Sequence, residues 1–346
     1  MTGSSGNSPS PTGTVRIAPV AAIPRVLEHL GFEPVATLAE MGFDIQLFED
    51  PENVIPYVAR SQLLERCADK TGCRHFGHLV ARSTSPSSFG ITGFLIQQLP
   101  DVATAIRAFV RYLHLHVDGA VTYLEEKPDS AFLGYSITHP GDEVTEQIAD
   151  AGVTAAFNIM RKLCGETWHP TKVCFTHGKP ENTRPFKQYF RAPLQFNAAK
   201  NGVAFSSIWL KSPLMGADPE LRVLLQRQID LLENRHSDDF TEQVSRVTHS
   251  AVLMHQANAE YVADLFAIHQ RTLNRRLRNC GTCFREILDK CRFDIAQQLL
   301  GNSSLNVSDI AAILDYTDAS AFARAFRRQS GKAPSAWREH YRQHNT

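Results

Sequence analysis

The chain lacks the features that would place it in or beyond a membrane. No run of about 18 apolar residues occurs, so no membrane-spanning helix is expected. The first residues, MTGSSGNSPSPTGTVR, have no hydrophobic stretch of the kind that signal peptides carry. The seven cysteines are odd in number and scattered, which favours reduced thiols over a disulfide framework. We therefore expect a cytoplasmic protein that has no membrane partner.

The sequence also lacks the motifs of common enzyme classes. It contains neither the Gly-x-x-x-x-Gly-Lys phosphate loop nor the Gly-x-Gly-x-x-Gly dinucleotide motif. No order of Ser, His and Asp and no pair of carboxylates stands out as a catalytic set. We therefore expect no enzymatic activity, no catalytic residues and no cofactor.

A net charge is absent too, because 36 basic residues balance 36 acidic ones. The distribution of charge is uneven, however. From His249 to Thr346 the chain carries 13 Lys and Arg against 9 Asp and Glu, an excess of +4, and the part before His249 has the opposite balance. This asymmetry predicts a basic module that binds nucleic acid, attached to an acidic domain.

The spacing of apolar residues divides the chain into three parts. Gly, Ser and Pro dominate residues 1–15, which predicts a disordered tail. Residues 16–235 mix helical with alternating patterns and predict an α+β domain, in which a hairpin turns at 127–129. Residues 236–346 show helical spacing throughout and predict an all-α domain. With 346 residues, the chain is long enough for both domains to bury a core.

Individual elements of the α+β domain can be placed from the same patterns. A glycine-bearing connection is expected at 89–93. The expected helices and strands are helices at 21–41 (two short ones), Ile55–Ala68, Val102–His116, Glu143–Leu163, Pro185–Phe190 and Asp218–Glu233, and strands at 119–125, 130–137, 173–177 and 202–209.

The segment Val307–Tyr341 predicts a helix, a turn and a second helix. Asp318 is the expected N-cap of the second helix, and Gly331 ends it because glycine tolerates a positive φ. Phe322 and Phe326 lie four residues apart and are expected to face inward. The opposite face of this helix carries Ser320, Ala323, Arg324 and Arg327.

A second copy of this plan lies about 49 residues upstream, in Asn258–Cys283. Leu273 and Leu277 take the inward places of its second helix, and the outward face carries Arg271, Asn274, Arg275 and Arg278. Between the copies, Phe284–Leu300 has apolar residues at helical spacing. A helix of this length is roughly 25 Å long, which sets the two units near one turn of DNA, about 34 Å, apart.

The two helix-turn-helix units, at about 258–281 and 307–331, resemble those of the AraC/XylS family of transcription regulators. The resemblance covers roughly the last 110 residues. Family members usually carry Gly-Phe where this chain has Asp315-Tyr316, so the turn departs from the family at that point. The N-terminal region, with IPRVLEHLG near its start and VAFSSIWL near its end, is similar to the arabinose-binding-type sensor domain. Nothing in it is specific for a sugar, and the sequence does not place an effector pocket.

This resemblance makes the outward helix faces candidate DNA contacts. In the major groove, arginine pairs with guanine and asparagine with adenine. Base contacts are therefore expected from Gln270, Arg271, Asn274, Arg275, Ser320 and Arg324. Phosphate contacts, which add affinity but little specificity, are expected from Arg278, Arg327 and Arg328.

Cysteine and histidine pairs invite a metal or redox interpretation, which we do not favour. Cys280 and Cys283 lie three apart, but a structural zinc site needs a second pair and none has that spacing. His114 and His116 lie two apart on an expected helix and so point to different faces. Packing and capping account for these residues, and we expect no metal site.

Together these patterns predict a bacterial, sequence-specific transcription regulator that responds to an effector. The resemblance implies an activator, because activation is commoner than repression in the family, but the sequence itself does not decide between the two. Its expected partners are double-stranded promoter DNA, a small-molecule effector in the N-terminal domain, a second copy of the chain, and RNA polymerase if it activates. It would associate with the nucleoid when bound to DNA. Helix 218–233 either serves as a dimerisation or linker helix or packs on its own domain. Two alternatives stay open: a redox- or metal-responsive regulator that uses Cys and His, and an effector-independent DNA-binding protein.

Overall fold

The computed structural model describes residues 14–117, 119–138, 146–235, 240–266 and 268–344. Its N-terminal domain is built on a five-stranded sheet of order β3-β4-β7-β5-β6. Neighbouring strands are antiparallel except for the parallel pair β5–β6. The strands are β3 (Ala120–Glu126), β4 (Ala131–Ile137), β5 (Lys172–Cys174), β6 (Leu194–Gln195) and β7 (Asn201–Phe205).

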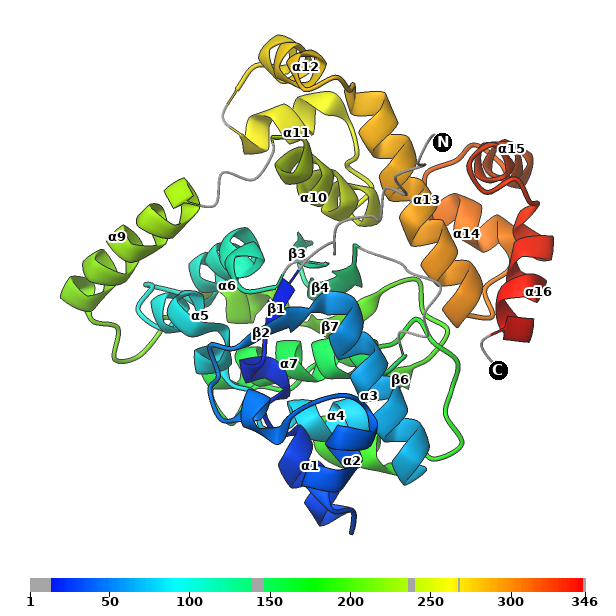
Figure 1. The fold of residues 1–346 in the computed structure, drawn as a ribbon. Coiled ribbons are helices and arrows are strands. Elements are labelled where there is room, and N and C mark those ends of the chain that lie inside the picture. The colour runs from blue at the N-terminus through cyan, green and yellow to red at the C-terminus, as the bar shows by residue number, and fades with distance from the viewer. Residues whose placement is uncertain (1–13, 118, 139–145, 236–239, 267, 345–346) are drawn as a thin grey trace, which may run out of the picture.

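Helices cover both faces of this sheet (Figure 1). Helix α7 (Glu146–Cys164) packs along β4 and β7 on one face of the sheet. Helices α3 and α4 pack against α7 in turn. The other helices of this domain, α3 and α4 included, lie around α7 and the sheet. They are α1 (Ile23–His29), α2 (Pro34–Glu40), α3 (Tyr57–Thr71), α4 (Phe76–Ala81), α5 (Gly90–Ile96), α6 (Val102–Tyr112), α8 (Arg184–Phe190) and α9 (Pro219–Arg235).

The C-terminal domain contains helices alone among its described elements. Helix α10 (Phe240–Leu253) and helix α13 (Phe284–Asn302) form its centre, and a helix-turn-helix unit lies at each end of α13. The first unit is α11 (Ala259–Leu265) with α12 (Gln270–Asn279). The second is α14 (Val307–Ile313) with α15 (Ala319–Ser330), and α16 (Pro334–His344) follows it. The expected fold class, an α+β domain followed by an all-α domain with two joined units, is confirmed.

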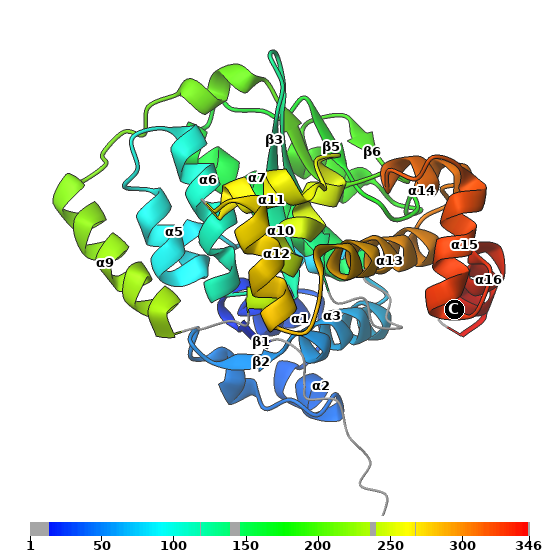
Figure 2. The ribbon, with the colours of Figure 1, turned by 90° about the horizontal axis from the view of Figure 1, so that it is seen from above.

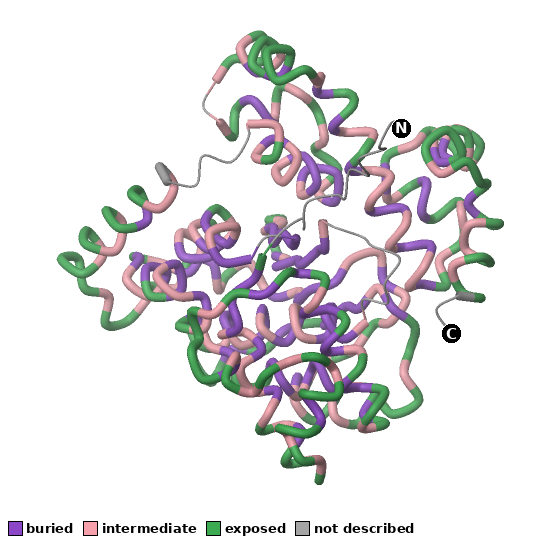
Figure 3. Tube along the Cα trace, viewed as in Figure 1, coloured by how far each residue is buried: buried purple, intermediate pink, exposed green. Residues whose placement is uncertain are grey.

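The domains share a buried interface on the sheet. Tyr123 of β3 is 1% exposed and packs in the core of the C-terminal domain, because α10 lies against β3. The side-chain amide of Gln298 on α13 donates to the backbone oxygen of Ile137, and Ser304 N–H donates to Asn197 Oδ1 at 2.9 Å. Figure 3 shows the sheet as mostly buried, whereas the outer turns of α12 and α15 are exposed.

Several expected boundaries are wrong, and tertiary pairing explains the differences. Strand β1 (Thr14–Arg16) pairs with β2 (Val54–Pro56), so the tail expected to reach residue 15 loses its last two residues to a strand. Helix α6 ends at Tyr112 rather than at His116, because the chain tightens into a 3-10 helix and Val117 then bridges to β1.

Two further expectations fail near glycine and serine. The expected connection at 89–93 is largely the first turn of α5, which begins at Gly90. The expected strand 202–209 stops at Phe205, and Ser207–Lys211 forms a 3-10 helix whose first hydroxyl donates to Pro128 O at 2.6 Å. The expected boundary at 236–239, and the start of the helix expected at Glu143, lie outside the described residues.

Helix α9 packs on its own domain through one face only. Ile229 is fully buried with Leu95 and Tyr112 of α5 and α6. Its other faces expose Leu221, Val223, Leu224 and Leu231. None of the described helices is both long and apolar enough to cross a membrane.

Gly134 is required by the domain interface. It pairs with Tyr123 across the hairpin, and a Cβ at this position would overlap the Tyr123 ring. That ring is 1% exposed and packs against α10, so displacing it disturbs the packing between the domains. We expect Gly134→Ala to lower the free energy of unfolding by about 1–3 kcal/mol, as overpacking commonly does.

Urea denaturation followed by circular dichroism measures this effect, and Gly178→Ala is the matched control. Gly178 is exposed, and a Cβ there would meet no atom within 4 Å. Equal free energies of unfolding for the two variants would show that the packing of the Tyr123 ring does not require glycine at position 134.

Candidate nucleic-acid interface

Helix α12 presents one polar face because its opposite face is buried. Leu273 and Leu277 are fully buried in the core of the C-terminal domain. His269 caps the start of the helix, because its ring Nδ1 accepts the N–H of Arg271 at 3.2 Å. Since residues three and four apart share a helix face, the predicted DNA contacts gather on the outer side.

The structure brings all five predicted residues of α12 together. They line one open depression, in which Gln270, Arg271, Arg275 and Arg278 are exposed and Asn274 is half-buried. His269 and Thr272 line the same depression and were not predicted. Their position at the helix start is the signal that would have found them, because N-terminal residues of a recognition helix commonly contact bases.

Not every arginine of α12 faces outward. Arg276 lies with its guanidinium carbon 5.4 Å from the centre of the Phe240 ring, which belongs to α10. This cation–π contact joins α12 to the supporting helix. Arg276 is therefore placed to position α12 rather than to bind DNA.

Helix α15 repeats the arrangement with a smaller polar face. The Asp318 carboxylate accepts the N–H of Ala321 at 2.7 Å, which caps the helix as expected. Phe322 and Phe326 are buried, and Gly331 ends the helix with φ at 74°. The predicted DNA contacts Ser320, Arg324, Arg327 and Arg328 are all exposed.

Arg328 differs from the other three. Its Nη2 lies 3.8 Å from Asp289 Oδ2 on α13, so its guanidinium leans towards the protein. The arginine is 65% exposed, and such a surface pair contributes little to stability. Arg328 therefore keeps its charge near the surface of α15 but is less free to reach a phosphate than Arg327.

The turn between α14 and α15 accommodates the departure from the family pattern. Asp315 adopts φ of 56°, a conformation that Asp tolerates better than most residues. Its carboxylate lies 2.6 Å from Nδ1 of His255, which follows α10 by two residues. The Tyr316 ring centre is 5.6 Å from that of Phe322, so tyrosine fills the apolar position as expected.

Helix α13 holds the two units apart. It has 19 residues, so its length is about 28 Å at 1.5 Å per residue. In Figure 1, α12 and α15 are both seen nearly end-on, and Figure 2 shows them on either side of α13. The length of α13 is thus of the same order as one turn of DNA, about 34 Å.

Four of the seven cysteines are buried, namely Cys67, Cys73, Cys174 and Cys291. Cys283 caps α13, because its N–H donates to Glu286 Oε2 at 3.1 Å. Burial raises the pKa of the Cys67, Cys164 and Cys291 thiols to about 12, which disfavours the reactive thiolate. Among the residues that the structure describes, no three His, Cys, Asp or Glu side chains group as metal ligands.

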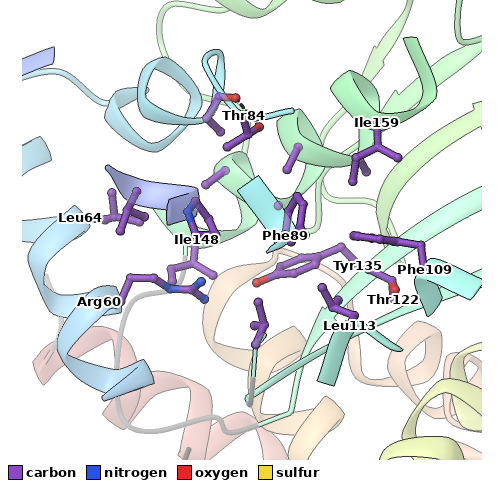
Figure 4. A pocket seen from close by; sticks show the side chains of 18 residues that line it. Arg60, Leu64, Thr84, Phe89, Phe109, Leu113, Thr122, Tyr135, Ile148 and Ile159 are labelled. Carbon is purple, nitrogen blue, oxygen red and sulfur yellow. Dashed lines mark hydrogen bonds between the residues drawn. The ribbon is translucent and has the colours of Figure 1, made fainter. Parts of the chain in front are cut away.

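A cavity of about 60 Å³ lies inside the N-terminal domain (Figure 4). It is enclosed by α3, α6, α7 and the first two strands of the sheet. Its wall is mainly aliphatic and aromatic, with Arg60, Thr84, Thr122 and Tyr135 as the polar members. The sequence did not place this cavity, because its wall comes from segments far apart along the chain.

Comparisons with known proteins match both domains. Residues 31–214 match the family model described as the arabinose-binding domain of AraC transcription regulators, N-terminal, and residues 262–340 match a helix-turn-helix domain. The chain is 22% identical over 315 residues to the HTH-type transcriptional regulator VirS of Mycobacterium tuberculosis, across 90% of this chain and 93% of that one. It is 24% identical over 299 residues to the ornithine utilization regulator of Pseudomonas aeruginosa, across 85% of this chain and 87% of that one.

A solved structure also matches along most of the chain. The transcriptional regulator CdpR of Pseudomonas aeruginosa is 20% identical, with a TM-score of 0.43, and the match covers 92% of this chain and 96% of that one. The match to the N-terminal family model alone spans more than half of the 346 residues. Since a helix-turn-helix domain follows it, the chain belongs to the AraC family of DNA-binding transcription regulators, and not to a family of enzymes.

Proposed function

We propose that this regulator binds promoter DNA through α12 and α15 and activates transcription when its N-terminal domain binds a small-molecule effector. The observation that carries the proposal is the repeated arrangement of a helix with one buried apolar face and one exposed polar face. The basic C-terminal part supplies the charge that attracts phosphate.

The two helices contribute unequally to specificity. Helix α12 offers Arg271, Asn274 and Arg275, whose side chains can each form paired hydrogen bonds with a base. Gln270 adds a fourth base contact at the start of the helix. Helix α15 offers only Ser320 and Arg324, so it adds less sequence preference. Arg278, Arg327 and Arg328 contact phosphates, which gives affinity that falls as salt rises.

The effector acts through the sheet. Thr122 of β3 lines the cavity, and its neighbour Tyr123 packs in the core of the C-terminal domain. Successive residues of a strand point to opposite faces. A ligand that favours one arrangement of β3 therefore also favours one arrangement of α10, which is the differential binding that allostery requires.

Two copies of the chain associate through α9 in this proposal. The apolar side chains on its outer faces, which are Leu221, Val223, Leu224 and Leu231, are 40–57% exposed. A second copy would cover them from water. RNA polymerase is the further partner of an activator, and the protein acts in the cytoplasm, on the nucleoid.

The dimer is tested by Leu224→Glu, which places a charge on the most exposed of these leucines. We expect light scattering to give twice the monomer mass for the unaltered chain and the monomer mass for the variant. Lys211→Glu, at an exposed site outside α9, is the control. A monomer mass for the unaltered chain at micromolar concentration would contradict the dimer.

DNA binding is tested by fluorescence anisotropy on duplexes from the regions that flank the gene and on random DNA, at two salt concentrations. We expect one flanking duplex to bind more tightly than random DNA and to keep that preference at the higher salt. Equal binding to every duplex, lost at higher salt, would contradict sequence-specific recognition in the absence of effector.

The roles of α12 and α15 are separated by two arginine variants. We expect Arg275→Ala to weaken binding to the preferred duplex by about 1–3 kcal/mol and to relax preference at one base pair. Arg327→Ala is expected to weaken all duplexes alike and to reduce the salt dependence.

The control for both variants is Arg227→Ala, which removes one exposed positive charge from α9. It should leave affinity and salt dependence nearly unchanged. An equal loss on specific and random DNA for Arg275→Ala would assign Arg275 to the phosphates instead of to a base.

A further inference from the structure

Arg60 is a buried charge in the wall of the cavity. It lies on α3, its side chain is 6% exposed, and its Nε and Nη2 have no hydrogen-bond partner among the described residues. The guanidinium carbon lies 4.5 Å from the centre of the Tyr57 ring. That cation–π contact offsets part of the loss of water but satisfies neither N–H group.

No carboxylate of the described residues forms an ion pair with Arg60. The half-buried acid on the same helix, Glu65, is engaged elsewhere, since its Oε1 accepts the N–H of Gln147 at 3.0 Å. The buried acid on α7, Asp150, pairs with His177 at 2.9 Å. A buried guanidinium without an anion is among the most unfavourable features that a protein core can hold.

Two further polar groups of the same wall lack a full set of hydrogen bonds. Thr122 Oγ1 is buried and has no hydrogen-bond partner among the described residues. The Tyr135 hydroxyl lies 3.5 Å from the Tyr57 hydroxyl, at the limit of a hydrogen bond. In Figure 4 the Arg60 guanidinium and the Tyr135 hydroxyl point towards one another across the cavity. The Arg60 guanidinium and the Tyr135 hydroxyl thus meet across one small space, and Thr122 lines another part of the same wall.

The rest of the wall is apolar. Its larger side chains are Leu64, Phe89, Phe109, Leu113, Ile148 and Ile159. The volume of about 60 Å³ is several times the roughly 10–15 Å³ that one water needs. This space fits a compact molecule of several heavy atoms and is too small for a nucleotide.

We propose that this cavity binds a small carboxylic acid with an apolar body, and that Arg60 pairs with its carboxylate. Guanidinium matches a carboxylate with two parallel N–H donors, and the Tyr135 hydroxyl donates a third hydrogen bond. The aliphatic and aromatic wall covers the apolar body. This assignment rests on the proposed effector function and names the chemical class of the effector.

The test compares acids with neutral amides of the same shape on the full chain. Butyrate, hexanoate and benzoate, with butyramide, hexanamide and benzamide as their partners, are titrated in thermal-shift and calorimetric assays at constant ionic strength. We expect the acids to raise the melting temperature and to bind about tenfold or more tightly than the amides, as a charge-assisted pair contributes.

Substitution at Arg60 assigns the preference to that residue. Arg60→Met removes the charge at similar volume, so the ligand-free variant should melt at the same temperature as the unaltered chain or higher. Its affinity for the acids should fall to that for the amides. Arg60→Lys should keep a weaker preference for acids. Arg66→Met, at an exposed position of the same helix, should behave as the unaltered chain.

Three results would overturn the carboxylate assignment: amides that bind as tightly as acids, an Arg60→Met variant that keeps its preference, or no binding of any acid. The comparison of acid with amide on the unaltered chain decides the matter even if Arg60→Met does not fold. If only the amides bound tightly, the carboxylate assignment would fail, but the proposed effector function would stand with a ligand of another chemical class. DNA affinity is measured separately, so failure of the proposed DNA binding would appear there and not in these titrations.

Discussion

Every functional part of this molecule depends on a sheet that is buried on both faces. Side chains of a strand alternate between faces, so β3 turns Thr122 towards the cavity and Tyr123 towards the C-terminal domain. Most small antiparallel sheets leave one face in water. Here the second face is covered by α10, which makes the sheet the common wall of the two domains.

Two glycines make room for aromatic rings that the strands of this sheet carry. Gly134 leaves room for the Tyr123 ring, and Gly152 on α7 leaves room for the Tyr135 ring, which a Cβ would approach to 2.5 Å. A close-packed interior of this kind does not absorb displacement locally. In the proposed effector response, a molecule that moved Tyr135 would shift β4, and with it the paired strand that carries Tyr123.

The sequence predicted the C-terminal domain far better than the cavity. The reason is that its helix ends are set by neighbouring residues, whereas the cavity is built from segments that are far apart along the chain. Asp318 and Gly331 mark the two ends of α15 through bonds to neighbouring residues, so local reading suffices. Strand β1 forms only because a strand some 40 residues away pairs with it. Arg60 occupies a helix whose sequence also suits a solvated arginine, and only the packing of α7 and the sheet buries it.

Helix α10 is where an effect on the sheet would reach DNA. It packs on β3 at one side and on α11, α12 and α13 at the other. His255, two residues beyond its C-terminal end, pairs with Asp315 in the turn before α15. The two DNA-binding units are thus connected to one helix, and that helix rests on the strand next to the cavity. A shift of α10 would move α12, which packs on it, and sequence-specific DNA binding depends on where the two recognition helices lie.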